Sequence, residues 1–192
     1  MNSHFTEVVS QILKENHEAL APIDEAAIEA FLRLLEDRQR IFVTGEGRSG
    51  LVMRMFAMRI THLGRQAYVV GDVTTPAIAS GDLLVVCSGS GETAIPCLRA
   101  ERAAQLGATV IAICGRPLAR LSQSAALTIL ISPPTPNEQS LPDQSKGKRT
   151  VQFGGSRFEQ SALLFCDIFA YLAMERWGVD LATMQARHAN LE

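Results

Sequence analysis

The sequence predicts an α/β fold, a three-layer doubly wound sheet of five parallel strands with extra helices at the N-terminus. Short apolar runs alternate with segments of helical periodicity. Each run is continuously apolar, which is typical of strands buried on both faces, and such strands form parallel sheets. Right-handed crossovers then favour the flavodoxin-like strand order 2-1-3-4-5, in which the first and third strands flank the switch point where ligands bind.

Composition favours a single domain over residues 1–192 and excludes several classes of function. Hydrophobic residues make up 47% of the 192 residues, enough for one full core. The formal net charge of −2 offers no general attraction to nucleic acid. No apolar run is long enough to span a membrane, and the first residues lack the core of a signal peptide. The cysteines are scattered without metal-ligand spacing, so we expect buried thiols in the cytoplasm and no metal site.

Residues 1–36 predict two leading helices. Apolar residues at helical spacing run through Phe5–Leu20, and Ala21-Pro22 breaks this pattern. Asp24 is then placed to cap a second helix that continues to Leu35. These helices cover either the domain's own sheet or a partner subunit, and the sequence leaves both alternatives open.

The first half of the predicted sheet contains two strands and one helix. Ile41–Thr44 is the first strand, and it runs into the turn Gly45-Glu46-Gly47-Arg48-Ser49-Gly50. A helix over Leu51–Leu63 follows and ends at Gly64, a residue type that suits the left-handed conformation of a C-cap. The second strand is Ala67–Val70.

The central strand, Leu83–Cys87, ends in a turn that has the features of an anion site. The turn, Ser88–Thr93, reads SGSGET and leads into a helix over Thr93–Leu106. Glycines let backbone N–H groups approach an oxyanion, hydroxyls add hydrogen-bond donors, and the helix N-terminus favours negative charge. We therefore predict that this turn binds a phosphate, and that the phosphate belongs to a sugar.

Two further strands and a long loop follow. The strands are Thr109–Cys114 and Ala126–Ile131, with a short helical turn at Leu118–Ser124 between them. Residues 132–155 are rich in Pro, Gln, Ser, Lys and Gly and lack periodicity. They predict a long irregular loop, and loops of this length inside one domain are usually functional or mobile.

Residues 156–192 predict two C-terminal helices. Phe158–Trp177 is apolar on several sides, which indicates burial in an interface as well as in a core. A last short helix over Leu181–His188 closes the chain. Because apolar leading helices accompany this long helix, we expect a homo-oligomer, either a dimer or a tetramer.

The turn after the first strand also matches a dinucleotide fingerprint. Gly45, Gly47 and Gly50 have the G-x-G-x-x-G spacing, and Asp72 follows at about the expected offset of ~20 residues. Three observations count against a dehydrogenase. The chain is short for an added substrate domain, Asp72 lies past the strand end, and the SGSGET turn would have no role. A purely structural tight turn is also open, although Arg48 and Ser49 offer more chemistry than a turn requires.

Four segments carry a more specific signal. They read GEGRSGLVMRMFAMRITHLG, VVGDVTTPAIASGDLLVVCSGSGET, FEQSALLFCD and, at the terminus, RHANLE. Together they resemble the sugar isomerase (SIS) domain family, and within it the 6-phospho-3-hexuloisomerases, from Ile41 to the C-terminus. Two features depart from that family: Glu46 stands where a small residue is expected, and 132–155 is longer and more polar. Both departures affect the rim of the site.

The resemblance implies an enzyme that converts 3-hexulose 6-phosphate to fructose 6-phosphate in the ribulose monophosphate pathway. Moving the carbonyl from C3 to C2 needs a base that shifts a proton from C2 to C3 through a cis-enediol, and a partly desolvated carboxylate suits this role. The resemblance places this carboxylate at Glu159. From the residues alone, Glu159 is an acid favoured by the dipole at a helix N-terminus. The reaction needs no metal or redox cofactor.

The resemblance also implies a set of substrate-binding residues on the two glycine turns. The hydroxyls of the SGSGET turn and its backbone N–H groups would bind the phosphate, Ser49 would bind sugar or phosphate, and Arg48 would pair with the phosphate or an enediolate. The residues of the SGSGET turn in this set are Ser88, Gly89, Ser90, Gly91, Glu92 and Thr93.

The sequence also contains two histidines to consider for catalysis, and it leaves two alternative functions open. His188 would act as the acid or base on the oxygen side if the C-terminal segment reaches a neighbouring subunit's site, whereas His62 lies at a helix end where histidines are commonly structural. A non-catalytic phosphosugar sensor would keep the SGSGET turn without needing Glu159. Another phosphosugar isomerase of the same fold is the nearest alternative among enzymes.

Overall fold

The computed structural model describes residues 2–131 and 150–191 and has a five-stranded, all-parallel sheet. The strand order is β2-β1-β3-β4-β5, so the predicted fold class and order 2-1-3-4-5 are confirmed. Each strand lies within a residue or two of its predicted bounds. The strands are β1 (Arg40–Gly45), β2 (Gln66–Val69), β3 (Leu83–Ser88), β4 (Thr109–Cys114) and β5 (Leu127–Leu130).

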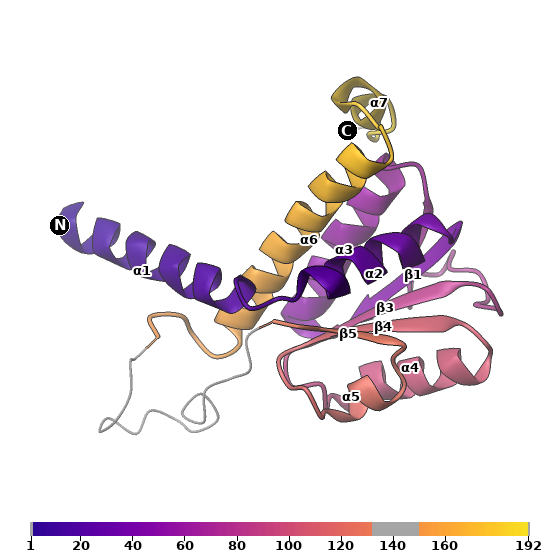
Figure 1. Ribbon diagram of the computed structural model, residues 1–192, viewed down its shortest axis with the longest axis horizontal. Helices are drawn as coiled ribbons and strands as arrows, with labels where there is room; N and C mark the ends of the chain where they lie inside the picture. Colours follow the sequence, from indigo (N-terminus) through magenta and orange to yellow (C-terminus); the bar gives the residue numbers. More distant parts are fainter. Residues whose placement is uncertain (1, 132–149, 192) are drawn as a thin grey trace.

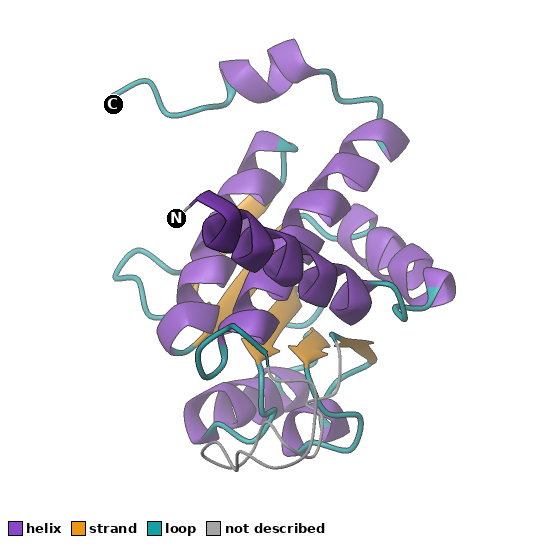
Figure 2. Ribbon diagram, turned by 90° about the vertical axis from the view of Figure 1, so that its left-hand side faces the viewer, coloured by secondary structure: helices purple, strands orange, loops and turns teal. Residues whose placement is uncertain are grey.

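Helices cover both faces of the sheet (Figures 1 and 2). One face carries α2 (Glu25–Glu36), α3 (Gly47–His62) and α6 (Ser156–Arg176), and the other carries α4 (Ala94–Gln105) and α5 (Arg120–Gln123). The remaining helices are α1 (Asn2–Leu20), which projects from the body, and α7 (Leu181–Ala186), which lies beyond the end of α6. Residues 132–149 of the predicted long loop lie outside the described residues.

The two hydrophobic cores follow from the alternation of side chains along buried strands. All residues of β3 are buried; Leu83, Val85 and Cys87 face the α2–α3–α6 layer, and Leu84 and Val86 face α4. Successive side chains of a strand point to opposite faces, so a strand covered on both sides must be apolar throughout. This is the pattern that predicted the parallel sheet.

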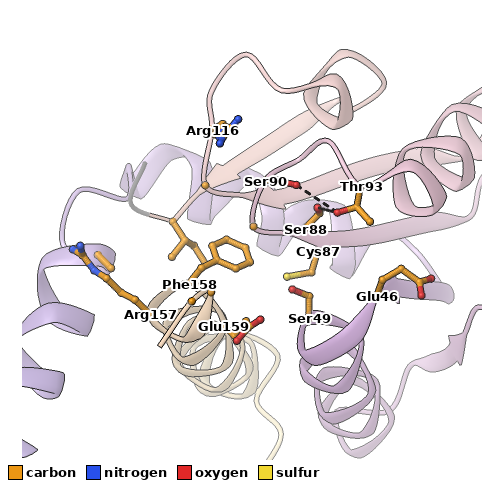
Figure 3. Close-up of a pocket in the computed structure, with 16 residues that line it drawn as sticks. Glu46, Ser49, Cys87, Ser88, Ser90, Thr93, Arg116, Arg157, Phe158 and Glu159 are labelled. Carbon is orange, nitrogen blue, oxygen red and sulfur yellow. Dashed lines mark hydrogen bonds between the residues drawn. The ribbon is translucent and has the colours of Figure 1, made fainter. Parts of the chain in front are cut away.

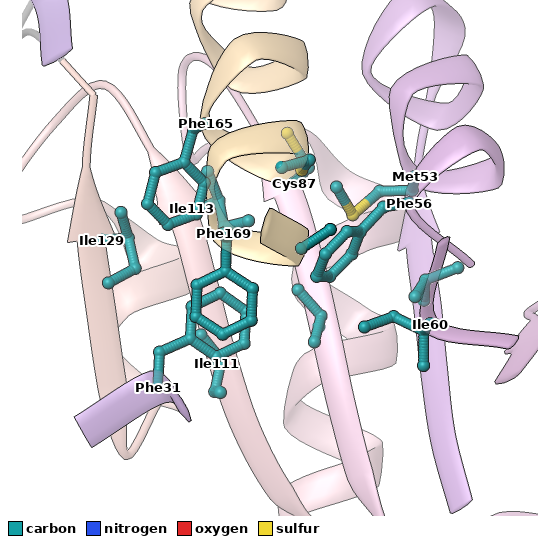
Figure 4. Packing of buried hydrophobic residues seen from close by; sticks show 14 of the residues in the cluster. Phe31, Met53, Phe56, Ile60, Cys87, Ile111, Ile113, Ile129, Phe165 and Phe169 are labelled. Carbon is teal, nitrogen blue, oxygen red and sulfur yellow. The ribbon is translucent and has the colours of Figure 1, made fainter. Parts of the chain in front are cut away.

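A cluster of phenylalanines holds the larger helical layer together (Figure 4). Phe31 of α2 stacks on Phe169 of α6 with ring centroids 4.2 Å apart, and Phe56 of α3 contacts Phe169 edge-on at 6.1 Å. Phe165, one helical turn before Phe169, stacks on Phe31 at 6.1 Å. Such aromatic pairs add to the free energy of burial, and they fix the body of α6 against α2 and α3.

The helix after β1 begins earlier than the sequence predicted. The prediction of a start at Leu51 was wrong by one turn, because α3 begins at Gly47, inside the glycine turn itself. Gly47 has a φ of 57°, which lets the chain turn from the strand into the helix. A Cβ on Gly50 would lie 2.7 Å from the carbonyl oxygen of Gly45, so only glycine allows the helix to start this close to the strand.

The two leading helices differ in what they cover. α2 packs on the sheet through Phe31 and Leu35, which are fully buried. α1 packs against α6 only near its C-terminal end, and Phe5 and Leu13 on its remaining length are 71% and 62% exposed. The first helix therefore has an apolar face that residues 2–131 and 150–191 leave uncovered.

Candidate active site

A cavity of about 560 Å³ lies at the carboxyl ends of β1, β3 and β4, where the first turn of α6 meets them (Figure 3). This is the place that the doubly wound topology predicts for a ligand. The two glycine turns reach it from neighbouring strands, as the sequence predicted. Its lining consists of Ala19, Glu46, Ser49, Cys87, Ser88, Gly89, Ser90, Thr93, Gly115, Arg116, Ile131, Gly154, Gly155, Arg157, Phe158 and Glu159.

Three hydroxyls of the SGSGET turn converge on the cavity. The Thr93 Oγ1 atom lies 3.0 Å from Ser88 Oγ and 3.4 Å from Ser90 Oγ. Thr93 is the N-cap of α4 but makes no side-chain capping bond, so its hydroxyl belongs to this cluster. Three hydroxyls at the N-terminus of a helix offer both donors and a favourable field for an anion.

The backbone of the same turn is already organised by its own hydrogen bonds. Gly91 N donates to the Ser88 carbonyl oxygen at 3.0 Å and to Ser88 Oγ at 3.2 Å, and Glu92 N donates to Ser90 Oγ at 3.1 Å. The Glu92 carboxylate turns outward and accepts from the backbone N–H of Arg120 at 3.0 Å. Gly91 and Glu92 are therefore placed beneath the hydroxyls, where they shape the turn.

Gly89 brings the turn into contact with α6. A Cβ at this position would lie 3.0 Å from the ring of Phe158, so the aromatic ring packs directly on the backbone of the turn. The Gly89 carbonyl oxygen accepts from Gly115 N at 3.1 Å, which joins the turns after β3 and β4. Any side chain here would push the first turn of α6 away from the cavity.

Ser49 and Cys87 form the floor of the cavity between the two turns (Figure 3). Ser49 is 8% exposed and Cys87 is fully buried. Burial raises the pKa of the Cys87 thiol to about 12 in spite of a hydrogen bond with Ser49. Cys87 is thus a neutral thiol at any physiological pH, and it does not act as a nucleophile.

Glu159 lines the cavity and forms an ion pair with Arg48, which is not among the lining residues. Arg48 Nε donates to Glu159 Oε2 from the start of α3, 111 residues away in the sequence. The Glu159 side chain is 17% exposed, whereas that of Arg48 is 60% exposed. Figure 3 shows the Glu159 carboxylate on the α6 side of the cavity, facing Ser49 and the SGSGET turn. A largely buried carboxylate beside a cluster of hydroxyls is suited to general base chemistry.

A second carboxylate on the rim is compensated by an arginine. Glu46 lines the cavity where a small residue was expected, and its Oε1 accepts from Arg99 Nη1 at 2.7 Å. The same nitrogen donates to Thr44 Oγ1 at 2.8 Å. Arg99 therefore holds Glu46 and balances its charge, which would otherwise repel an anionic ligand.

Two arginines of the cavity lining were missed by sequence reasoning. Arg116 follows β4, where the sequence indicated only a loop, and its carbonyl oxygen accepts from the Cys114 thiol at 3.2 Å. Its Nε atom is buried and has no hydrogen-bond partner among the described residues. Arg157 lies next to Phe158. The position of Arg116 at a strand's carboxyl end was the signal that could have identified it.

The histidines lie far from this cavity within one chain. His62 is 4% exposed at the end of α3, and the ring of His188 lies 5.0 Å from it, centroid to centroid. Ser49 is in the first turn of the same 16-residue helix, which is about 24 Å long. The structure thus does not bring His188 to Glu159, and its predicted role stays a prediction about a neighbouring subunit.

Asp72, the acid of the alternative dinucleotide fingerprint, lies outside the cavity. It accepts from Arg54 of α3 at 2.7 Å and 3.2 Å. Packing explains two of the fingerprint's glycines, since a Cβ on Gly45 would lie 2.9 Å from the carbonyl oxygen of Cys87 and one on Gly50 would lie 2.7 Å from that of Gly45, and a φ of 57° explains Gly47. Neither feature requires a dinucleotide.

Comparison with known proteins agrees with this geometry. Residues 34–144 match the family described as SIS domain. The chain is 40% identical over 188 residues to the Bacillus subtilis protein named 3-hexulose-6-phosphate isomerase, covering 97% of this chain and 98% of that one. It is 36% identical to the Mycobacterium gastri protein of the same name, covering 97% and 91%.

A solved structure extends the likeness to three dimensions. A hypothetical protein of Methanococcus jannaschii, whose crystal structure was reported to infer a function of 3-hexulose-6-phosphate isomerase, superposes with a TM-score of 0.78. The two chains are 30% identical and each is covered to 99%. The present chain therefore belongs to the SIS domain family and, within it, to the family of the 3-hexulose-6-phosphate isomerases. Among the described residues, no helix has the length and apolarity needed to cross a membrane.

Proposed function

We propose that this protein isomerises 3-hexulose 6-phosphate to fructose 6-phosphate in the ribulose monophosphate pathway. The observation that carries the proposal is the position of Glu159. A largely buried carboxylate faces three clustered hydroxyls across a cavity of about 560 Å³, a size within the range of small-molecule sites. Phosphate binding alone would need only the hydroxyls.

The phosphate binds at the SGSGET turn. Ser88, Ser90 and Thr93 supply three hydroxyls at the N-terminus of α4, where the helix field favours negative charge. Arg116 lies at the same edge of the sheet and has a buried Nε without a partner among the described residues. We assign Arg116 to the phosphate as its guanidinium partner, since arginine pairs well with phosphate oxygens.

The proton transfer takes place at Glu159. Its carboxylate removes the proton from C2, the electron pair of that bond forms the C2=C3 double bond, and the C3 carbonyl oxygen takes up a proton from the acid on the oxygen side to give the cis-enediol. The O2 proton then passes to the conjugate base of that acid, the C2 carbonyl forms, and Glu159 returns its proton to C3. The isomerisation needs no external oxidant, because C2 is oxidised as C3 is reduced. The Arg48 guanidinium beside Glu159 stabilises the negative charge that develops on the enediol oxygens.

The protein forms a homo-oligomer in the cytoplasm, and exposed apolar residues on the surface of the chain support this assembly. Two neighbouring helices expose apolar residues at helical spacing, and exposed stripes of this kind mark contact surfaces. In such an assembly, His188 of one subunit would serve as the oxygen-side acid or base in another subunit's cavity. The exposed residues are Leu51, Met55 and Met58 on α3, and Leu164, Ile168 and Tyr171 on α6.

The test is to supply 3-hexulose 6-phosphate and to follow the formation of fructose 6-phosphate. We expect turnover by the wild-type protein and a loss of kcat by about 10³-fold or more in Glu159→Gln, with inorganic phosphate still bound. Glu18→Gln, an exposed change on α1, is the control and should keep full activity. Phosphosugar binding without turnover would favour the sensor, and turnover only of an aldose phosphate would favour a different isomerase.

A further inference from the structure

A buried polar network joins α1 to the wall of the cavity. Glu15 and Asn16, in the C-terminal part of α1, are 5% and 4% exposed. Their partners Gln152 and Ser161, just before and just inside α6, are 6% and 0% exposed. Buried polar side chains usually form hydrogen bonds, because each unpaired group costs free energy, and in this network only Gln152 Oε1 lacks a partner among the described residues. Nothing in the proposed chemistry uses these residues directly.

Glu15 holds the segment that leads into α6. Its carboxylate accepts from Thr150 Oγ1 at 2.6 Å, from Gln152 Nε2 at 2.9 Å and from Gln11 Nε2 at 2.8 Å. Burial acts to raise the pKa of Glu15, but these hydrogen bonds together with one from the Val151 backbone outweigh it and lower the pKa. The carboxylate therefore stays ionised, and both oxygens act as acceptors.

Asn16 holds the first turns of α6 itself. Its Oδ1 accepts from Ser161 Oγ at 3.0 Å, and its Nδ2 donates to Gln160 Oε1 at 3.3 Å. Gln160 and Ser161 directly follow Glu159 in the sequence. Glu15 and Asn16 thus hold the chain on both sides of Glu159, one before it and one after it.

The stretch between these two attachments is the part of α6 that forms the cavity wall. It contains Gly154, Gly155, Phe158 and Glu159, and Ala19 of α1 completes this wall. The body of α6 is fixed separately, since Phe165 and Phe169 pack on Phe31 well beyond the first turn. The polar network therefore acts on the start of the helix and not on the fold as a whole.

We propose that Glu15 and Asn16 are positioning residues that set the place of the Glu159 carboxylate relative to the bound substrate. The proposal rests on the isomerase function proposed above. It also gives α1, which the sequence left without an assigned role, a part in the reaction. A carboxylate displaced by about 1 Å from its reacting carbon can lose about 10²-fold in rate. Among the described residues, the SGSGET turn between β3 and α4 receives no hydrogen bond from the side chains of this network.

The decisive experiment compares a variant that disrupts the hydrogen bond between Glu15 and Gln152 with a double variant that restores it. Glu15→Gln keeps the size of the side chain but turns one acceptor into a donor facing Gln152 Nε2. We expect kcat to fall by about tenfold or more, while KM and the inhibition constant of inorganic phosphate change by less than about threefold. The double variant Glu15→Gln/Gln152→Glu exchanges donor and acceptor across the same contact, and we expect it to recover most of the lost kcat. Asn16→Ala should lower kcat in the same way.

Controls separate positioning from a general loss of structure. Glu18→Gln, exposed on the same helix, should match the wild type. Active-site concentration is measured by titration with inorganic phosphate, so that unfolded protein does not lower the apparent kcat. The proposal is overturned if the kcat of Glu15→Gln equals that of Glu18→Gln. It is also overturned if Glu15→Gln loses phosphate affinity in parallel with kcat and the double variant Glu15→Gln/Gln152→Glu recovers neither quantity. A wild-type protein that binds phosphate but isomerises nothing would overturn the proposed function, and the positioning role with it.

Discussion

The SGSGET turn, the proposed phosphate site, depends on Gly91, and this can be tested by calorimetry. Gly91 has a φ of 65°, and a Cβ added to it would lie 2.3 Å from the Cβ of Ala119. Gly178 has nearly the same backbone conformation, with a φ of 63°, but a Cβ there would meet nothing within 4 Å. The pair Gly91→Ala and Gly178→Ala therefore separates the cost of the backbone conformation from the cost of the steric overlap.

The magnitudes follow from these two contacts. A left-handed conformation costs an L-residue about 1–2 kcal/mol, and this applies to both variants. Overpacking at Gly91 adds about 1–3 kcal/mol, because Ala119 is buried and must move. The sum for Gly91→Ala is about 2–5 kcal/mol. At about 2–4 °C per kcal/mol for a chain of this size, we expect Tm to fall by about 4–20 °C.

The assay is differential scanning calorimetry of both variants beside the wild type, followed by a phosphate titration. Gly178→Ala should lower Tm by only about 2–8 °C and leave phosphate affinity unchanged. Gly91→Ala should lower Tm further and weaken phosphate binding, because Gly91 N is hydrogen-bonded to Ser88 in the turn. Equal values of Tm for the two variants would refute the reasoning, since they would mean that the turn relaxes away from Ala119 without cost.

Two further predictions address charge. Arg116→Gln should raise KM and the inhibition constant of inorganic phosphate by about tenfold or more with little change in kcat, since a charged hydrogen bond contributes about 1.5–3 kcal/mol. The control is Arg102→Gln, a change at an exposed residue. If both variants have the same KM and the same inhibition constant of inorganic phosphate, Arg116 does not bind the phosphate. Asp82→Asn should lower the free energy of unfolding at pH 7 by about 1–3 kcal/mol, measured by urea denaturation, because the Arg40 guanidinium holds the pKa of Asp82 below its ordinary value of 3.8. That contribution is present above pH 3.8 and is lost as pH falls through the lower folded pKa, so the wild type and the variant should converge in acid. A difference that does not shrink as the pH is lowered below 3.8 would contradict this assignment.

The parts of the fold that could be predicted from the sequence are those determined locally. A continuously apolar run such as Leu83–Cys87 identifies a doubly buried strand without knowledge of its neighbours. The hydroxyls of the SGSGET turn are adjacent in the sequence and do converge, whereas the binding of phosphate there stays a prediction. The helix start at Gly47 was misplaced because the close approach of Gly50 to Gly45 is a tertiary contact, which periodicity does not report.

The parts that could not be predicted depend on contacts between distant segments. Arg48 meets Glu159 across 111 residues, and nothing in the pattern around either residue indicates this pair. Only the family resemblance singled out Glu159, and its role stays a prediction. The resemblance did not point to Arg116, because a lone arginine in a short loop has no spacing to recognise. In the sequence Glu15 is one of several charges in the first helix, and nothing near it indicates its partners Thr150 and Gln152.

The contacts around the cavity divide its lining into two halves, and we expect mutations in the two halves to change different kinetic constants. The half made by the turns after β3 and β4 is tied into the central sheet, since Gly89 and Gly115 share a hydrogen bond and Gly91 packs on Ala119. The half made by the start of α6 is attached through the buried polar contacts of α1 and the Phe158 ring. If phosphate affinity resides in the first half and proton transfer in the second, substitutions in the turns act mainly on KM, and substitutions in α1 act mainly on kcat. Among the described residues, the first helix lines the cavity only through Ala19, and it then affects the reaction mainly because its polar contacts determine where α6 begins relative to the SGSGET turn.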